Sequence, residues 1–359
     1  MALRIVDGVD HYTNSQKLTV GGWGSFTVAG GGAGSATVTA GIGRTSAGMR
    51  MHVGTSSADF GRLFRTVSTA SGATFIGHFG FKISALPTTR VAFFTVADAN
   101  TAHVYLIVNN TGTISVKRGS TVLGTTTNAI SAGNYYHIVL KVVISDASGT
   151  VDLLINNASW LSLSSQDTKN TANATWDSFS LAADNDGAVN VATDIDFDDI
   201  VLLDGVDGTS LTPSQGSTFN TSMGDVSVVA NVATGDGNYT QFTSSSGGTH
   251  FDDIDDVTPN DDTDYNEDGT ANDRDSYTYP ITSTRTILAL ALFPYVKQTS
   301  AAAKQFLTFF RAGGVNYDST ITNNLGTSYA FFPEFFGADP STSAAWAGGS
   351  VEAGVKVVS

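Results

Sequence analysis

The sequence predicts an all-β protein, and three features of the chain support this expectation. Only three of the 33 acidic residues are glutamate, namely Glu267, Glu334 and Glu352, so the other 30 are aspartate. Aspartate favours turns, whereas glutamate favours helices. The chain also has 38 glycines and many Thr, Ser and Val residues, as expected for strands joined by turns. Finally, apolar and polar residues alternate with a period of two in several segments.

The segment FIGHFGFKI from Phe75 to Ile83 illustrates this alternation. Phe79 and Phe81 fall on one face, and His78 and Lys82 fall on the other, which predicts a half-buried strand. Other strands predicted in the first half are Val104–Val108 and Thr113–Lys117, which form a hairpin around NNTG, together with Tyr135–Ile144, Val151–Ile155 and Asp196–Asp204. Short strands at near-regular spacing predict a sandwich or a barrel.

The length of 359 residues predicts two domains, because single cores rarely exceed about 250 residues. A polar segment without periodicity, containing Pro213, is the expected linker at 209–222. We therefore expect an N-terminal jelly-roll sandwich over 1–208 and a smaller C-terminal β-sandwich over 223–359. Strands predicted in the second domain are Asp225–Val232, Thr286–Val296 in a central position, Lys304–Arg311, Tyr329–Phe336 and Val351–Val358, with a helical turn at Ser341–Trp346.

The formal charge of −15 argues against nucleic-acid binding, which depends mainly on Lys and Arg. No apolar run approaches the roughly 18 residues of a membrane helix, so membrane insertion is not expected. The start, MALRIVDGVDHY, lacks a signal-peptide pattern, which predicts a protein made in the cytosol. Cysteine is absent, which excludes disulfides and thiolate metal sites.

Two passages of the first domain resemble the concanavalin-A-like lectin/glucanase jelly roll in its laminin-G-like branch. They are YYHIVLKVVISDASGTVDLLINNASWL from Tyr135 to Leu161, a paired central hairpin, and DFDDIVLLD from Asp196 to Asp204, which resembles the last strand of that fold. The resemblance implies a concanavalin-A-like jelly roll over 1–208.

The second domain resembles a segment that recurs in bacteriophage virion proteins, where it follows a lectin-like jelly roll. The similar stretches are Gly224–Tyr265, RAGGVNYDS from Arg311, TSYAFFPEFFGADPSTSAAW and VEAGVKVV. DGVDHY near the start of the chain is also similar to the opening of that family. The chain departs from the family at Phe242, where Trp is expected, and at AGGS before Val351.

This resemblance implies a non-catalytic structural component of a virion, either a capsid decoration or a tail-associated protein. Its expected partners are copies of itself and other virion proteins. The alternative is a tail protein that recognises a host-surface glycan.

The jelly roll also occurs in retaining glucanases, so a glycoside hydrolase is an alternative to a structural protein. Retaining hydrolysis usually needs two carboxylates about 5–5.5 Å apart. Residues 1–266 contain no glutamate, and the nearest lookalike is DIDFDD at Asp194–Asp199. The shorter Asp side chains fit poorly, so we expect Asp196, Asp198 and Asp199 to cap or flank the closing strand. We therefore predict no enzymatic activity and no required cofactor.

One segment has the oxygen-ligand spacing of a twelve-residue calcium loop, namely DYNEDGTANDRD at Asp264–Asp275. The ligands at the predicted positions are Asp264, Asn266, Asp268, the Thr270 carbonyl, Asn272 and Asp275. The flanks are predicted as loop and strand rather than helices, so an acidic, solvated loop is the alternative.

Glycan binding is the main alternative to a purely structural role. Lectin-like sandwiches bind sugars with loop aromatic residues and with Asp or Asn. The candidates are Trp23, Trp160, Trp176 and the DNDG turn at Asp184–Gly187. Tryptophan is highly buried on average, so packing of these side chains in the core is the competing interpretation.

Overall fold

A computed structural model describes residues 3–12, 23–24, 27–29, 34–44, 47–67, 72–204, 225–281, 286–300 and 302–359. These residues are almost entirely strands and turns, which confirms the predicted all-β fold. They fall into two compact units, the first holding the described residues up to Asp204 together with Asp225–Val228, and the second beginning at Val229. The predicted linker at 209–222 lies outside the described residues.

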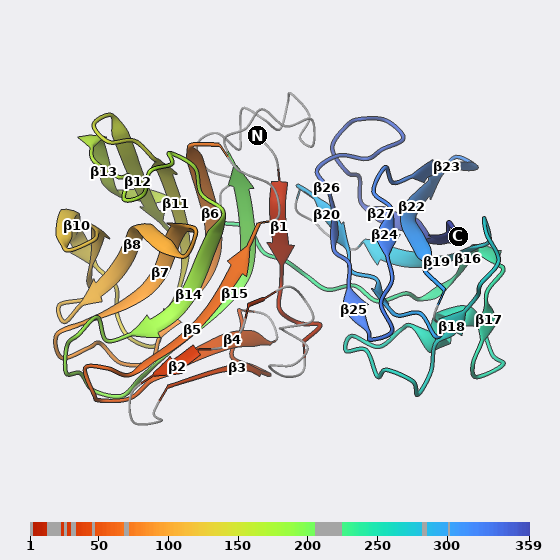
Figure 1. Ribbon diagram of the computed structural model, residues 1–359, viewed down its shortest axis with the longest axis horizontal. Helices are drawn as coiled ribbons and strands as arrows, with labels where there is room; N and C mark the ends of the chain where they lie inside the picture. The colour runs from red at the N-terminus through yellow and green to blue at the C-terminus, as the bar shows by residue number, and fades with distance from the viewer. Residues whose placement is uncertain are drawn as a thin grey trace. The chain divides into compact units, whose positions relative to one another are not determined.

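The first unit is a jelly-roll sandwich of two antiparallel sheets (Figure 1). The eight-stranded sheet runs in the order β13 (Ala158–Gln166), β12 (Gly149–Ile155), β11 (Tyr135–Val143), β6 (Thr74–Ile83), β15 (Thr193–Asp204), β4 (Gly48–Val53) and β3 (Ser35–Thr39), with β1 (Leu3–Asp7) paired to β15. The seven-stranded sheet runs in the order β10 (Thr121–Ala129), β9 (Thr113–Arg118), β8 (Thr101–Asn109), β7 (Arg90–Asp98), β14 (Ser178–Asp184), β5 (Phe60–Thr66) and β2 (Thr27–Ala29).

Aromatic side chains pack the two sheets against each other. Phe79 of β6 stacks on Phe94 of β7 with ring centroids 4.5 Å apart, and Phe81 lies 4.5 Å from Phe93. These four side chains are fully buried. The alternation predicted for Phe75–Ile83 therefore gives β6 its core-facing side, and aromatic pairs of this kind add to the stabilisation from buried area.

A buried carboxylate, Asp7, joins the two sheets of the first unit. Its Oδ1 accepts a hydrogen bond from Val9 N at 2.9 Å. Its Oδ2 accepts hydrogen bonds from three donors, namely Tyr12 Oη at 3.0 Å, Trp23 Nε1 at 3.0 Å and Arg65 Nη1 at 3.1 Å. Arg65 is also buried, so each charge is compensated by the other. Because Asp7 ends β1 and Arg65 lies on β5, this ion pair spans the sandwich.

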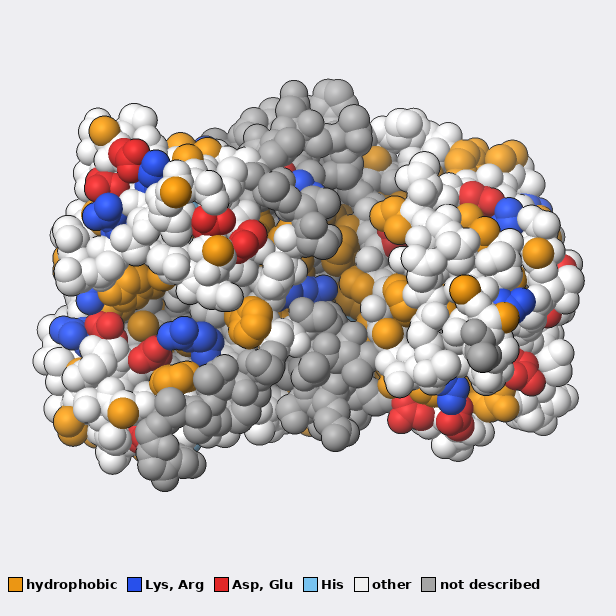
Figure 2. Space-filling view, viewed as in Figure 1, with side chains coloured by type: hydrophobic (Ala, Val, Ile, Leu, Met, Phe, Trp, Pro, Cys, Tyr) orange, Lys and Arg blue, Asp and Glu red, His pale blue; other side chains and the backbone are white. Residues whose placement is uncertain are grey.

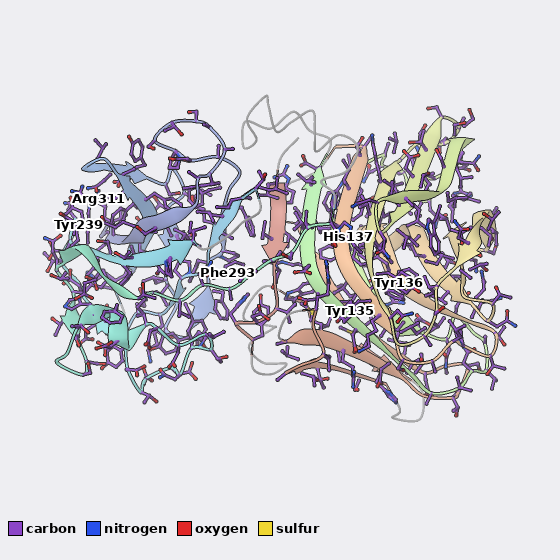
Figure 3. All side chains as sticks on the ribbon, turned by 180° about the vertical axis from the view of Figure 1, so that it is seen from behind. Tyr135, Tyr136, His137, Tyr239, Phe293 and Arg311 are labelled. Atoms are coloured by element: carbon purple, nitrogen blue, oxygen red, sulfur yellow. The ribbon has the colours of Figure 1, made fainter. Side chains whose placement is uncertain are left out.

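Two histidines lie side by side on the outer face of the eight-stranded sheet. His78 of β6 and His137 of β11 have ring centroids 5.6 Å apart, and Figure 3 marks His137 along its strand. Both are buried, and neither ring nitrogen of either residue has a hydrogen-bond partner among the described residues. Burial, with His137 nearby, lowers the pKa of His78 from 6.5 to about 3. Burial likewise lowers the pKa of His137 to about 4.

The described residues of the second unit form one six-stranded sheet and three small two-stranded sheets. The large sheet runs β16 (Gly235–Thr240), β19 (Arg274–Ile281), β27 (Gly349–Val357), β22 (Gln305–Ala312) and β23 (Val315–Asp318), with β24 (Asn323–Asn324) paired to β22. The small sheets pair β17 (Thr243–Ser244) with β18 (Asn266–Glu267), β20 (Leu290–Leu292) with β26 (Glu334–Phe336), and β21 (Tyr295–Val296) with β25 (Ala330–Phe331).

Two strands predicted in the second unit are confirmed, because β22 covers most of Lys304–Arg311 and β27 covers most of Val351–Val358. Tyr329–Phe336 is not one strand: it divides into β25 and β26, with Pro333 between them. The apolar run Thr286–Val296 is not one central strand: it divides into β20 and β21, and Pro294 lies between them. Proline cannot donate to a sheet ladder, which explains the break. Asp225–Val232 forms no strand, and the 3₁₀ turn at His250–Asp253 was not anticipated.

We expect Asp7→Ala to destabilise the protein by about 3–5 kcal/mol, because it leaves the buried Arg65 guanidinium without its carboxylate. Urea unfolding monitored by tryptophan fluorescence measures this loss. The matched control is Asp146→Ala, whose carboxylate is 70% exposed and pairs with Lys169. It should cost less than about 1 kcal/mol. Equal losses for the two variants would contradict the role given to Asp7.

We expect His78 to make the protein less stable in mild acid. Its folded pKa is about 3 and its ordinary pKa is 6.5, so at pH 4.5 only the unfolded chain takes up this proton. Stability should therefore fall as the pH drops below 6.5, by about 2–3 kcal/mol at pH 4.5 from this residue. His78→Leu should remove that part of the loss. Urea unfolding at pH 7 and pH 4.5 tests this, and an unchanged pH difference in the variant would refute it.

Candidate functional site

The outer face of the seven-stranded sheet carries a row of residues that crosses five strands. Their backbones are directly opposite one another in register, so their side chains share one face. The row, called the cross-strand row below, consists of Lys117 on β9, Tyr105 on β8, Thr95 on β7, Ser180 on β14 and Phe64 on β5. At about 4.8 Å per strand it spans about 19 Å.

The alternate positions of the same strands face the core. They are Val116, Leu106, Phe94, Leu181 and Leu63, all of which are buried. The outer and inner rows therefore follow from the period-two geometry of the strands. Figure 2 shows the first unit from a side on which hydrophobic side chains lie between Lys or Arg and Asp or Glu side chains.

A second outer row lies next to the cross-strand row. It consists of Ser115, Ile107, Ala92, Asp184 and Phe60. Ser115, Ile107 and Ala92 are buried, so the middle of this second row is not exposed to solvent. Aromatic side chains lie on both sides of β7 and β14. Tyr105 is on β8, and Phe60 and Phe64 are on β5.

The Asp184–Gly187 turn supplies two carboxylates to this face. Asp186 Oδ2 accepts a hydrogen bond from Arg90 Nε at 2.7 Å and from Lys117 Nζ at 3.1 Å. Asp184 Oδ2 accepts one from Arg62 Nη2 at 2.7 Å. The Lys117 ammonium also lies 5.1 Å from the centroid of the Tyr105 ring, within the range of a cation–π interaction.

A buried amide holds the turn in place. Asn185 is fully buried, and its Nδ2 donates to the carbonyls of Gly54 at 3.0 Å and Ser56 at 2.6 Å. Its Oδ1 accepts from Asn190 Nδ2 at 2.9 Å. Asp186 follows in the left-handed region with φ of 47°, which Asn and Asp tolerate better than most residues. The orientation of Asp186 therefore depends on Asn185.

The three tryptophans proposed as sugar-binding candidates lie elsewhere. Trp23 is buried against Asp7, and Trp176 is buried with its Nε1 donating to Thr74 O at 3.0 Å. Trp160 is half-buried on the edge strand β13. Of the candidates, only the turn at Asp184–Gly187 is brought together with an aromatic side chain and several cations.

Four residues of this face were not among the site residues predicted from the sequence, namely Tyr105, Lys117, Arg90 and Arg62. One signal was available for two of them, because the predicted hairpin of Val104–Val108 and Thr113–Lys117 places Tyr105 opposite Lys117. The arginines come from separate strands, and no local pattern connects them to the turn.

The acidic segment of β15 lies on the outer face of the other sheet, and cations on neighbouring strands pair with it. Asp196 accepts two hydrogen bonds from Arg50, at 2.7 and 2.9 Å, and lies 3.6 Å from Lys82 Nζ. Asp198 is buried and accepts hydrogen bonds from Arg44 N at 2.7 Å and Asp199 N at 2.8 Å. Burial and the neighbouring Asp199 raise the pKa of Asp198 to about 7. Both carboxylate oxygens of Asp198 therefore accept hydrogen bonds from backbone N–H groups.

The residues of the predicted calcium loop are held by other contacts. Asp275 is buried and accepts hydrogen bonds from His250 Nδ1 at 2.9 Å and Tyr277 Oη at 2.8 Å. Asn266 Nδ2 donates to His250 O, and Asp268 Oδ1 accepts from the backbone of Gly269 and Thr270. Asp264 lies half-buried in the preceding loop.

The described residues contain no group of three or more His, Asp or Glu side chains placed to hold a metal ion. Asn266 Oδ1 and Asp268 Oδ2 are nevertheless buried and have no hydrogen-bond partner in the described part of the chain. Calcium binding stays a prediction.

Among the solved structures that this chain resembles in fold are enzymes that act on carbohydrates. A sialidase matches at 12% identity over 65% of this chain with a TM-score of 0.44, and the chain spans 22% of its length. An alginate lyase in complex with an alginate trisaccharide matches at 12% identity, over 56% of this chain and 97% of the lyase, with a TM-score of 0.38. A GH131 β-glucanase catalytic domain from Podospora anserina matches at 11% identity, over 57% of this chain and 97% of that domain, with a TM-score of 0.41.

No family model matches the chain, and a search of curated proteins gives no match. The described residues include no helix that is long and apolar enough to cross a membrane.

These comparisons correct two predictions. The chain was expected to be a non-catalytic structural component of a bacteriophage particle, or else a phage receptor-recognition protein, and was expected not to be an enzyme. The solved structures named above are carbohydrate-active enzymes, and none of them is a phage particle protein. Both predictions are overturned by this finding.

At identities of 11–12% the likeness shows the jelly-roll fold alone and assigns no activity to this chain. The resemblance of the second unit to a phage segment, the virion location and the expected self-association stay predictions, because no comparison tests them.

We expect Asn185→Ala to destabilise the protein by about 1–3 kcal/mol, since it leaves two buried carbonyls and the Asn190 amide without their partner. Urea unfolding measures the loss. The control is Asn128→Ala on the edge strand β10, where the side chain is exposed. It should change stability by less than about 0.5 kcal/mol. If both variants unfold at the wild-type midpoint, the anchoring role of Asn185 is refuted.

Proposed function

We propose that the first unit binds carbohydrate on the outer face of its seven-stranded sheet, along the cross-strand row. The observation that carries this proposal is the combination of Tyr105 with the charged groups of Asp186, Arg90 and Lys117 on one sheet face.

A pyranose ring has an apolar C–H face and a rim of hydroxyl groups, and each matches part of this surface. The C–H face can lie against an aromatic ring, while carboxylate and guanidinium groups accept and donate hydrogen bonds to hydroxyls. Ion pairing and Asn185 fix the polar groups before any ligand arrives, which reduces the entropy lost on binding.

The test is a binding panel of soluble neutral and acidic polysaccharides, measured by isothermal titration calorimetry. We expect at least one to bind, and Tyr105→Ala to weaken that binding about 5-fold, as for the loss of one aromatic contact worth about 1 kcal/mol. The control is Tyr135→Ala, which removes a tyrosine of the opposite sheet whose hydroxyl donates to Ile42 O.

The proposal would be contradicted if no polysaccharide of the panel bound at millimolar concentration. So would equal weakening by the two tyrosine variants. Release of reducing ends, followed in the same samples, reports whether a bound polysaccharide is also cleaved.

A further inference from the structure

Lys117 is a buried ammonium group with few partners. The residue is only 9% exposed, and its side chain extends from β9 over the outer face of the sheet. The described contacts give Nζ one hydrogen-bond acceptor, Asp186 Oδ2 at 3.1 Å, and one ring, Tyr105. An ammonium has three donors, so two remain for other acceptors. Burying a charge is costly unless it is paired and hydrogen-bonded.

The single carboxylate beside Lys117 is shared. Asp186 Oδ2 also accepts the shorter bond from Arg90 Nε, at 2.7 Å. Asp184, the other carboxylate of the turn, pairs with Arg62. In this contact group, as far as the structure describes the chain, three cations share the two carboxylates of the turn: Arg62, Arg90 and Lys117. This excess of one positive charge lies in a chain whose formal charge is −15.

We propose that this face takes an acidic sugar, and that a carboxylate of a uronic acid lies against Lys117. This inference rests on the proposed carbohydrate binding and adds the class of ligand. A carboxylate supplies charge-assisted acceptors to the free donors of the ammonium and balances the excess charge. A neutral sugar supplies hydroxyl acceptors only and leaves the excess charge in place. The Tyr105 ring next to Lys117 contacts the apolar side of the same sugar unit.

A sulfate ester carries the same charge, and the experiment separates the two groups. Binding is measured by calorimetry for two matched pairs: polygalacturonate against its methyl-esterified form, and dextran sulfate against dextran. The members of each pair share a backbone and differ in the anionic group. We expect the dissociation constant of polygalacturonate to be about 10-fold lower than that of its methyl ester. This difference corresponds to one hydrogen bond to a charged group. The sulfated pair should show a smaller difference.

The variant Lys117→Met keeps the length of the side chain and removes the charge. It should reduce the preference for polygalacturonate over its ester to less than about 3-fold, while Lys117→Arg should retain most of it. The matched control is Lys82→Met on the opposite sheet. Lys82 has a similar setting, 3.6 Å from Asp196 and 5.5 Å from the Tyr135 ring centroid, and its replacement should leave the preference unchanged.

The outcomes distinguish the two proposals. Equal binding of polygalacturonate and its ester would overturn the acidic-sugar inference and leave the proposed function standing. A larger preference for dextran sulfate than for polygalacturonate would overturn the assignment to a uronic acid. A preference that survives Lys117→Met would overturn the role of Lys117. If no polysaccharide binds at all, the proposed function fails as well.

Discussion

The arrangement of the candidate site depends on one buried amide. Asn185 uses both ends of its side chain, donating to two carbonyls of the 54–56 segment and accepting from Asn190. These bonds fix a turn that contains a residue at positive φ, and the turn carries Asp186 from the end of β14 toward Arg90 and Lys117. Without that anchor, Arg90 and Lys117 would lie on this face without the Asp186 carboxylate that now pairs with both, and their charges would repel each other. The polar chemistry of the face is therefore a consequence of a hydrogen-bond network beneath it.

Much of the fold of the first unit follows from local pattern. The alternation in Phe75–Ile83 identifies β6 and its core-facing side, and the hairpin signal NNTG identifies β8 and β9. The second unit was less predictable. The apolar run Thr286–Val296 has the composition of a central strand, yet it is divided in two around Pro294. An apolar run alone does not show how many strands it contains. A single proline, which has no backbone N–H to donate, determines where strand pairing stops.

The candidate site could be predicted only in part, because its residues come from distant parts of the sequence. The turn Asp184–Gly187 was recognisable by its residue types, but the cations that pair with its carboxylates lie between 69 and 122 positions away in the sequence. Tryptophan was a misleading guide, because Trp23 and Trp176 serve the core. Net charge was also a poor guide to the local surface. A chain at −15 still gathers Arg62, Arg90 and Lys117 on one sheet face, since a total says nothing about how charges are distributed.

The separation between the outer and inner rows of the seven-stranded sheet has an evolutionary consequence. Each position of the cross-strand row has sequence neighbours that point into the core. A substitution in the row therefore alters the chemistry of the outer face and spares the packing of Leu106, Phe94 and Leu181. Five strands thus provide five positions of variation on a constant scaffold, of which Tyr105 and Lys117 are coupled by their contact. Descendants of one ancestral sandwich can diverge in what they recognise through single codon changes, without passing through unfolded intermediates.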